Sequence, residues 1–482
     1  MTALTAIGTY VPRLRLARKT ILEGQGKRGG KGERAVCGWD EDALTMAVEA
    51  ARGCLRDADV TVGGITLAST TMPFEERQNA TILASALTLG EDIRTLDTGG
   101  TQRAGTSALI EAVAAAGAGG DRLVVASDKR EAKPGSPQEL SFGDGAAAVC
   151  VGPGDGIAEV LATRSRAVDF IDHYRGQGRR FDYYWEERWI RDEGYLKLVP
   201  GVVTAALEAA GVAPGDVAHA VLPQGVPKAA QGKCKAVGLP TEALADSLQD
   251  RVGETGTAHP LMMLAAVLEK AEPGQVIVLV GFGQGCDVIV LRATELLAKR
   301  RTRDWFSGPL ARRAEEASYY RYMARNELVE RDEGMRAEVD YQSAMTQIYR
   351  RRDMLLGLVG GRCTECGTPQ FPRARVCVNP ACGSFAEQEA YPFADRTAKV
   401  VSWSADHLTY TPEPPARYGL IQFEGGGRMF ANFTDVAGPE VDVGSEMRMV
   451  FRIKEFDRKR GFRRYFWKAT PVAGGADDTG GA

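Results

Sequence analysis

Four cysteines in the last third of the chain place the strongest constraint on what it can fold into. Cys363 and Cys366 form one short pair, and Cys377 and Cys382 form a second one. Two such pairs on turns can bring four thiolates to one tetrahedral Zn²⁺ ion. Because four sulfur ligands leave no open coordination position, we expect a structural zinc site with a domain built around it. Reduced thiols without a metal are the alternative.

The composition is that of an ordinary globular protein. Of the 482 residues, 44% are hydrophobic and 26% are charged, and this length allows two or three domains. A formal net charge of −3 gives no reason to expect binding to nucleic acid or to a membrane surface. The chain contains no apolar run of about 18 residues, and Met1–Tyr10 lacks the pattern of a signal peptide. Together with the free thiols, these features predict a cytoplasmic protein.

Residues 1–297 alternate apolar, strand-like runs with alanine-rich helical stretches. This rhythm predicts an α/β architecture with buried strands, and its recurrence in the second half of the segment indicates an internal duplication. The expected strands are 65–70, 123–127, 146–151, 218–222, 276–280 and 288–291, and the expected helices are 105–116 and 260–270.

The rest of the chain changes character three times. Residues 298–357, rich in arginine, glutamate, tyrosine and methionine, predict a polar helical connector, and residues 358–390 are the expected zinc ribbon. Residues 391–473 contain short alternating strands separated by turns, which predicts a small β-barrel of about five strands. These strands are expected at 399–407, 419–423, 428–433, 446–453 and 463–467, and a disordered tail at 474–482.

The ribbon and barrel segments resemble the DUF35 family, in which a rubredoxin-like zinc ribbon precedes an OB-fold. The resemblance rests on Gly361–Arg373, Cys382–Ser384 and Val400–Ser404, and it covers residues 358 to 473. Domains of this family work beside thiolase-superfamily enzymes, so the resemblance implies a part in binding acyl-CoA.

Residues 1–297 resemble the 3-hydroxy-3-methylglutaryl-CoA synthase and ketoacyl synthase III branch of the thiolase superfamily. The matching segments, in order, are Ala6–Pro12, Leu96–Thr98, Ser141–Ala148 and Gly281–Gly285. The resemblance implies a thiolase-like fold of duplicated αβαβα layers, a coenzyme A thioester as substrate, and a homodimer.

The resemblance fails at the active-site positions. Enzymes of this branch form an acyl-enzyme on a cysteine at the N-terminus of a buried helix. Gln102 occupies that position here, and an amide cannot be acylated. The position of the synthase histidine corresponds to Pro223 or Gln224, and that of its general-base glutamate to Thr70 or Thr71. We therefore do not expect hydroxymethylglutaryl-CoA synthase activity.

Polar residues remain near the missing nucleophile. Glu254 falls where ketoacyl synthases carry a catalytic asparagine, and His259 matches a thiolase Gly-His-Pro sequence. A histidine can exchange protons near neutral pH, although a packing role for His259 and a surface position for Glu254 are the alternatives. The amides of Phe282 and Gly283 could complete an oxyanion hole with Gln102.

The segment Asp169–Tyr184 aligns with a stretch near the synthase pocket. Tyr174 is our first candidate proton donor, because a phenol can protonate an enolate in a polarised site, although aromatic packing is the alternative. The other candidate donors are His173, Tyr183 and Tyr184. Arg175 and Lys228 are candidate ligands of the coenzyme A phosphates.

Three functions are compatible with these residues. We expect a carbon–carbon lyase that cleaves a 3-hydroxyacyl-CoA by a retro-aldol reaction, as do thiolase-like aldolases with DUF35 partners. His259 or a tyrosine would remove the β-hydroxyl proton, and Gln102 with the 281–283 amides would stabilise the enolate. Acyl transfer or decarboxylative condensation is the first alternative and would need Cys286 as a nucleophile. A catalytically inactive scaffold that binds acyl-CoA is the second.

Overall fold

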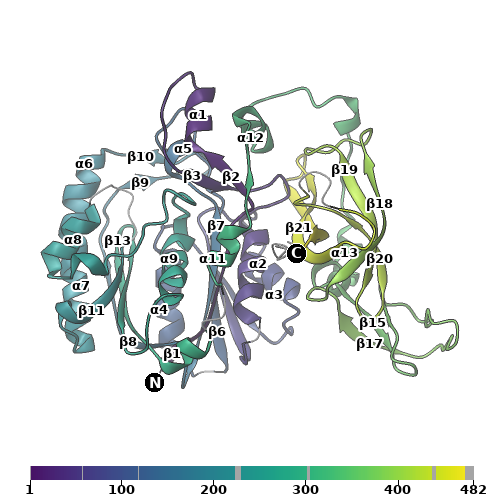
Figure 1. The fold of residues 1–482 in the computed structure, drawn as a ribbon, viewed down its shortest axis with the longest axis horizontal. Helices are drawn as coiled ribbons and strands as arrows, with labels where there is room; N and C mark the ends of the chain where they lie inside the picture. The colour runs from purple at the N-terminus through teal and green to yellow at the C-terminus, as the bar shows by residue number, and fades with distance from the viewer. Residues whose placement is uncertain are drawn as a thin grey trace, which may run out of the picture. The chain divides into compact units, whose positions relative to one another are not determined.

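The computed structural model describes two compact units of the chain (Figure 1). Unit 1 comprises Met1–Gly38, Asp42–Leu83 and Glu91–Ala324, and unit 2 comprises Trp39–Glu41, Ala84–Gly90 and Arg325–Ala482. The residues described within them are 2–56, 58–117, 119–222, 229–300, 304–436 and 441–472. The expected tail at 474–482, Lys228 and the positions Pro223 and Gln224 lie outside these ranges.

Within the described residues, unit 1 is built on one mixed sheet of nine strands. In spatial order these are β11 (Val217–Val221), β12 (Val276–Phe282), β13 (Gly285–Ala293), β8 (Ala158–Ala167), β1 (Thr2–Tyr10), β7 (Gly145–Pro153), β6 (Asp121–Asp128), β4 (Val62–Ala68) and β5 (Arg94–Thr98). The antiparallel pairs β1–β7 and β7–β6, followed by parallel β6–β4, are repeated as β8–β13, β13–β12 and β12–β11. The internal duplication predicted from the sequence is therefore confirmed.

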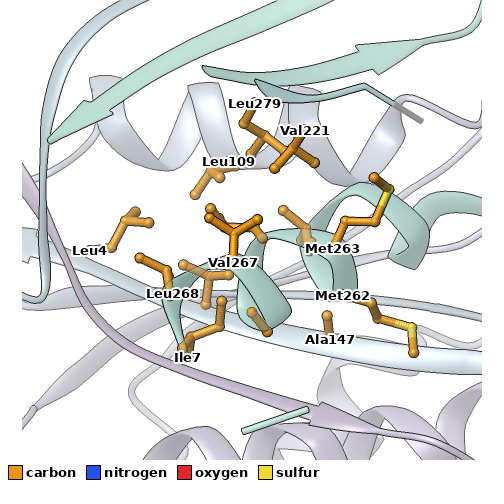
Figure 2. Close-up of a cluster of buried hydrophobic side chains, with 14 of the residues drawn as sticks. Leu4, Ile7, Leu109, Ala147, Val221, Met262, Met263, Val267, Leu268 and Leu279 are labelled. Carbon is orange, nitrogen blue, oxygen red and sulfur yellow. The ribbon is translucent and has the colours of Figure 1, made fainter. Parts of the chain in front are cut away.

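Two central helices lie between the halves of this sheet. Nearly every residue of α9 (His259–Leu268) is buried, which is expected of a helix enclosed on all sides. It packs against α4 (Ala104–Ala114), and Figure 2 shows their side chains in one apolar core with residues of β1, β7, β11 and β12. On the outer faces, α2 (Ala43–Leu55) contacts β1, β6 and β7, while α7 (Leu196–Ala210) contacts β8 and β13. This layering is the α/β arrangement that the sequence predicted.

The expected connector is only partly helical. Trp305 and Phe306 are buried in the core of unit 1, and Ala314–Glu315 (β14) pairs with Leu14–Ala17 (β2), so its first part is anchored to that unit. The helices of the segment are all short: α10 (Glu295–Arg300), α11 (Ser307–Ala311), α12 (Tyr319–Arg325), α13 (Met345–Arg350) and α14 (Arg352–Leu356). Charge content alone does not sustain a long helix, because most helical stability comes from packing an apolar face.

Unit 2 contains a small ribbon and a five-stranded sheet. The ribbon strands are β15 (Val359–Cys363), β16 (Pro369–Gln370) and β17 (Gln388–Pro392). The sheet runs in the order β20 (Arg428–Asn432), β19 (Ala416–Phe423), β18 (Ala398–Asp406), β21 (Glu446–Asp457) and β22 (Phe462–Pro471). All of its pairings are antiparallel, and each expected strand of the barrel overlaps an observed one. Among the helices that the structure describes, none has the length and apolarity to cross a membrane.

Candidate functional site

The four ribbon cysteines gather at one point, as the sequence predicts. Their sulfur atoms all lie within 4.8 Å of one another. Each pair is closed by a turn in which a glycine has positive φ, Gly367 at +72° and Gly383 at +55°, a conformation that glycine adopts without steric cost. A set of four thiolates at this spacing fits a tetrahedral Zn²⁺ ion, which would link the two turns and supply structural rigidity.

A second polar cluster lies in unit 1 and is centred on Arg130, which follows strand β6. Its Nη1 atom lies 2.5 Å from Oε2 of Glu254, its Nη2 atom lies 3.1 Å from Oδ2 of Asp182, and the guanidinium covers the ring of Phe142 at 3.8 Å. Burial of Arg130 acts to lower its pKa, but Glu254 and the other nearby acidic groups raise it, and the net pKa is raised. The centre of the cluster is thus a buried, permanent cation with two carboxylate partners.

Gln102 joins this cluster from the turn between β5 and α4. Its amide lies 3.0 Å from Nε2 of His173. With the amide oxygen turned toward Arg130, it accepts hydrogen bonds from Nη2 (2.9 Å) and Nη1 (3.0 Å) of the guanidinium and from Nε2 of His173. Gln102, which we predict at the nucleophile position, is therefore an oriented neutral amide in this cluster.

The turn that carries Gln102 is fixed by its neighbours. Arg103 pairs with the buried carboxylate of Asp287 (2.7 Å) and donates from Nε to the carbonyl of Gly283 (2.8 Å). A Cβ atom on Gly283 would lie 2.5 Å from Oγ1 of Thr101, so only glycine allows the β12–β13 turn to approach this closely. The start of α4 is consequently held against the end of the sheet.

The predicted oxyanion hole shares this turn. The amide of Gly283 donates to the carbonyl of Gly285 (3.1 Å), and Phe282 pairs with Cys286 in the β12–β13 ladder. The Gly283 amide is thus engaged within the turn in this structure. The assignment of Phe282 and Gly283 to an oxyanion hole stays a prediction.

A short antiparallel ribbon sorts the candidate proton donors onto two faces. Strand β9 (His173–Tyr174) pairs with β10 (Tyr183–Tyr184), with His173 opposite Tyr184 and Tyr174 opposite Tyr183. The rings of His173 and Tyr184 are stacked at 4.9 Å on the face toward Gln102, whereas Tyr174 is 56% exposed on the other face. The structure thus places Tyr184, not Tyr174, beside Gln102.

The surroundings of Tyr184 keep its phenol protonated. Burial raises its pKa, the positive charge of Arg130 opposes this effect, and the net pKa is raised. Arg130 donates to the phenol oxygen from Nη2 at 3.3 Å. Tyr184 is therefore suited to donate a hydrogen bond, and poorly suited to give up its proton.

His259 lies near Glu254 in sequence but has a different environment. Its Nε2 atom lies 2.9 Å from the carbonyl of Ser247, and Nδ1 faces the amide of Thr255 at 3.3 Å. Burial lowers the pKa of His259, with Glu254 opposing, so the ring is neutral and both nitrogens are engaged with backbone. The arrangement orders the turn in which Oε1 of Glu254 accepts from Gly256 (2.8 Å). Gln102 and Glu254 meet through Arg130, whereas His259 contacts Ser247 and Thr255.

The remaining candidates also support the cluster. Arg175 pairs with Asp182 (2.7 Å) and donates to the carbonyl of Thr70, so it fastens the β9–β10 ribbon. The residue is exposed, and its role as a ligand of the coenzyme A phosphates stays a prediction. The hydroxyls of Thr70 and Thr71 both donate to the buried Oδ1 of Asp128, at 3.1 Å and 2.9 Å. The position expected of a glutamate base is thus filled by hydroxyl groups committed to an internal carboxylate.

The sequence analysis missed Arg130 and its partner Asp182, and it did not single out Asp172. A signal for Arg130 was present, because it belongs to a charged stretch directly after an expected strand, where functional groups of α/β proteins commonly lie. For Asp182 and Asp172 no comparable signal exists, since the ribbon that carries them has two-residue strands.

The fold of unit 1 defines the class of protein. Solved structures with the same fold include 3-oxoacyl-(acyl carrier protein) synthase III from Pseudomonas aeruginosa, at 22% identity and a TM-score of 0.56, covering 61% of this chain and 98% of that one. A hydroxymethylglutaryl-CoA synthase solved with CoA matches at 18% identity and a TM-score of 0.61, covering 71% and 94%. The family model for the C-terminal part of 3-oxoacyl-(acyl carrier protein) synthase III matches residues 207–291. Unit 1 is therefore thiolase-like.

Curated relatives narrow this class. Hydroxymethylglutaryl-CoA synthase from Caldivirga maquilingensis is 30% identical over 291 residues, which are 58% of this chain and 83% of the relative. The synthase from Aeropyrum pernix is 31% identical over 290 residues, 58% and 80% of the two chains. The chain belongs to the hydroxymethylglutaryl-CoA synthase family.

Two further family models match unit 2. The ChsH2 rubredoxin-like zinc ribbon domain matches residues 357–387, and the ChsH2 C-terminal OB-fold domain matches residues 391–452. The predicted ribbon followed by an OB-fold is thereby confirmed, and the four-cysteine site falls within the ribbon match.

Proposed function

We propose that this chain processes an acyl-CoA thioester without forming an acyl-enzyme, by retro-aldol cleavage of a 3-hydroxyacyl-CoA. One observation carries the proposal: His173 and Tyr184 lie side by side, within hydrogen-bonding reach of Gln102, which we predict at the position of the family's nucleophile. An acid–base group and two neutral donors are what an aldol reaction needs, and none of them has to bond covalently to the substrate.

His173 exchanges the proton in this proposal. Its Nε2 takes the proton of the β-hydroxyl, the C–O bond becomes a carbonyl, and the electrons of the Cα–Cβ bond pass to the thioester as an enolate. Tyr184 and the amide N–H of Gln102 donate hydrogen bonds to the enolate oxygen. The imidazolium of His173 then protonates Cα, so that a shortened acyl-CoA and an aldehyde or ketone leave. In the reverse direction the same groups perform an aldol addition.

The charges of the cluster favour a neutral reacting group. Arg130 is already paired with Glu254 and Asp182, and Arg175 shares the second of these carboxylates. A substrate carboxylate placed beside Arg130 would add a third negative charge to this paired set, which is unfavourable in a buried site. This arrangement supports retro-aldol cleavage over decarboxylation.

Acyl transfer is the second candidate, because the curated relatives are named as synthases. That reaction requires an accessible thiolate. Cys286, the thiol expected to serve, is fully buried in β13, and the other four cysteines of unit 1 are buried as well. Buried thiols of this kind support the non-covalent route.

Mass spectrometry of the protein and the small molecules after incubation with 3-hydroxyacyl-CoAs and with acetyl-CoA tests the proposal. We expect a shortened acyl-CoA, a carbonyl product and an unchanged protein mass. His173→Gln should lower kcat about 10²–10⁴-fold, whereas the matched His219→Gln should not. An acyl adduct on the protein would establish acyl transfer instead, and CoA binding without turnover of any substrate would identify a scaffold.

We further propose a homodimer in the cytoplasm. Strand β5 is the last strand of the nine-stranded sheet, and Leu96 on it is 55% exposed, so an edge that carries an exposed leucine is open to a second copy. Nine cysteines, five of them buried in unit 1 and four gathered for a metal, suit a reducing compartment. Sedimentation of wild type and Leu96→Lys tests the dimer, since a buried charge at this edge should give monomers.

A further inference from the structure

Asp172 precedes the ribbon and lies against His173 on the side away from Gln102. Its Oδ1 atom is 3.0 Å from Nδ1 of His173 and also accepts from the backbone N–H of that residue at 2.8 Å. Asp172 itself is 7% exposed, and its carbonyl accepts from the amide of Trp185 (3.2 Å). The His173 amide therefore holds the carboxylate, and the Trp185 amide holds the backbone of Asp172.

The two nitrogens of His173 thus face two different oxygen atoms. When Nε2 carries a proton it donates to the Gln102 amide oxygen at 3.0 Å, and when that proton has left, the amide can turn its N–H toward the bare nitrogen. Nδ1 is buried without a well-aligned hydrogen bond and lies 3.0 Å from Oδ1 of Asp172. A bare Nδ1 lone pair 3.0 Å from a carboxylate oxygen is electrostatically unfavourable, whereas a proton on Nδ1 makes this contact favourable. A ring that keeps its Nδ1 proton can gain or lose only the proton on Nε2.

We propose that Asp172 is a positioning residue that keeps Nδ1 of His173 protonated and so makes Nε2 the atom that exchanges protons with substrate. The pair supplies an oriented base in a site that has no nucleophile for it to activate. Asp172 need not touch the substrate, because it acts through the orientation of the imidazole while Nε2 of His173 takes up and returns the proton. The inference rests on the role proposed for His173.

Other charged groups around His173 do not substitute for Asp172. Tyr184 of β10 stacks on the ring face, while Arg130 after β6 lies on the far side of Gln102. The carboxylates of Glu254 and Asp182 are paired with Arg130, and Arg175 of the ribbon also pairs with Asp182. Among the residues that the structure describes around this ring, Asp172 is the carboxylate that lies at ion-pair distance from Nδ1.

The chain offers a direct readout, because it contains only four histidines, His173, His219, His259 and His407. Nitrogen-15 NMR of histidine-labelled protein, with His173 assigned from the spectrum of His173→Gln, reports which nitrogen carries the proton in the neutral ring. We expect Nδ1–H in the wild type and a shift toward Nε2–H in Asp172→Asn. A wild-type ring that is neutral as Nε2–H would overturn the inference, whether or not any substrate is turned over.

Kinetics give an independent test once a substrate is found. Asp172→Asn should lower kcat about 10²–10⁴-fold with a smaller change in KM, and should displace the limb of the kcat pH profile that reports His173. Asp172→Glu should recover part of the loss, and Asp192→Asn, at an exposed carboxylate, should behave as wild type. Equal pH profiles for Asp172→Asn and wild type would sink the inference while leaving the proposed reaction intact.

Discussion

The zinc ribbon and the Arg130 cluster are two polar sites built in opposite ways. The ribbon takes its four ligands from one stretch of 20 residues, Cys363 to Cys382, and two tight turns suffice to bring them together. The Arg130 cluster draws on Gln102, Arg130, the ribbon that carries His173 and Tyr184, and the turn at Glu254. The first site depends on local turns, and the second depends on the whole fold of unit 1.

The largest expected effect follows from breaking the local site. Removing zinc with a strong chelator, or replacing Cys377 by serine, should unfold residues 358–390, because structural zinc sites of this kind contribute about 10–16 kcal/mol of apparent binding free energy. Metal analysis should give one zinc per chain in the wild type. Hydrogen exchange should show that the zinc ribbon opens while the buried amides of α9 stay protected. Loss of protection in α9 would mean that the zinc site and the core of unit 1 are not stabilised independently.

Removing Arg130 from the Arg130 cluster should destabilise the protein less than removing the zinc does, but more than any other single substitution in the cluster. Arg130→Met leaves Glu254 and Asp182 without their shared partner in a buried place, which should lower the free energy of unfolding by about 3–5 kcal/mol. Arg180→Met removes an exposed guanidinium paired with Glu131 and serves as the control, with an expected loss of about 0–1 kcal/mol. Denaturant titration of both variants decides; equal losses would mean that Arg130 is not the centre.

His259, at the start of α9, should make the folded protein less stable as the pH falls below neutral. Because the pKa of His259 in the folded state lies below the ordinary value of 6.5, the unfolded chain binds the proton first as pH falls. Stability should therefore fall from about pH 6.5 downward, by at most about 1.4 kcal/mol per pH unit, until the folded pKa is reached.

Replacing His259 by glutamine should remove this acid component and cost about 1–3 kcal/mol at neutral pH, since the backbone groups it pairs with would be left unpaired. The exposed His407, changed to glutamine, is the control. Unfolding titrations at several pH values between about 5 and 8 provide the measurement. A His259→Gln variant with unchanged pH dependence of stability would show that another group is responsible.

The smallest effect is expected on the exposed face of the β9–β10 strand pair in unit 1, where Tyr174 lies. Tyr174→Phe should change neither stability nor kcat beyond about 0.5 kcal/mol, because its ring is half exposed. Tyr184→Phe removes one proposed hydrogen bond to the enolate and should lower kcat about 10²-fold. Turnover assays on the two variants compare the two faces of the β9–β10 pair. Equal losses of kcat would argue against a catalytic role for the face that carries Tyr184.

What the sequence predicted, and what it did not, follows the same division. The cysteine ligands, the barrel strands and the central strands of unit 1 were foreseen because spacing and periodicity within one segment determine them. Arg130 and Asp182 could not be paired from sequence, since 52 positions separate them and only the folded sheet brings them together. Tyr174 was preferred over Tyr184 because a two-residue strand gives no periodic signal from which its inward face could be read.

In the β9–β10 strand pair, successive side chains point to opposite faces, and this has a consequence for how such a protein can evolve. Inserting or deleting one residue in the loop between His173–Tyr174 and Tyr183–Tyr184 would reverse which side chains of one strand face Gln102. Tyrosine would then replace histidine at the amide, or the second tyrosine the first, with no substitution in either strand. The length of the loop between β9 and β10 therefore determines which side chain lies beside Gln102. We expect relatives with a different loop length here to differ in the reaction they catalyse.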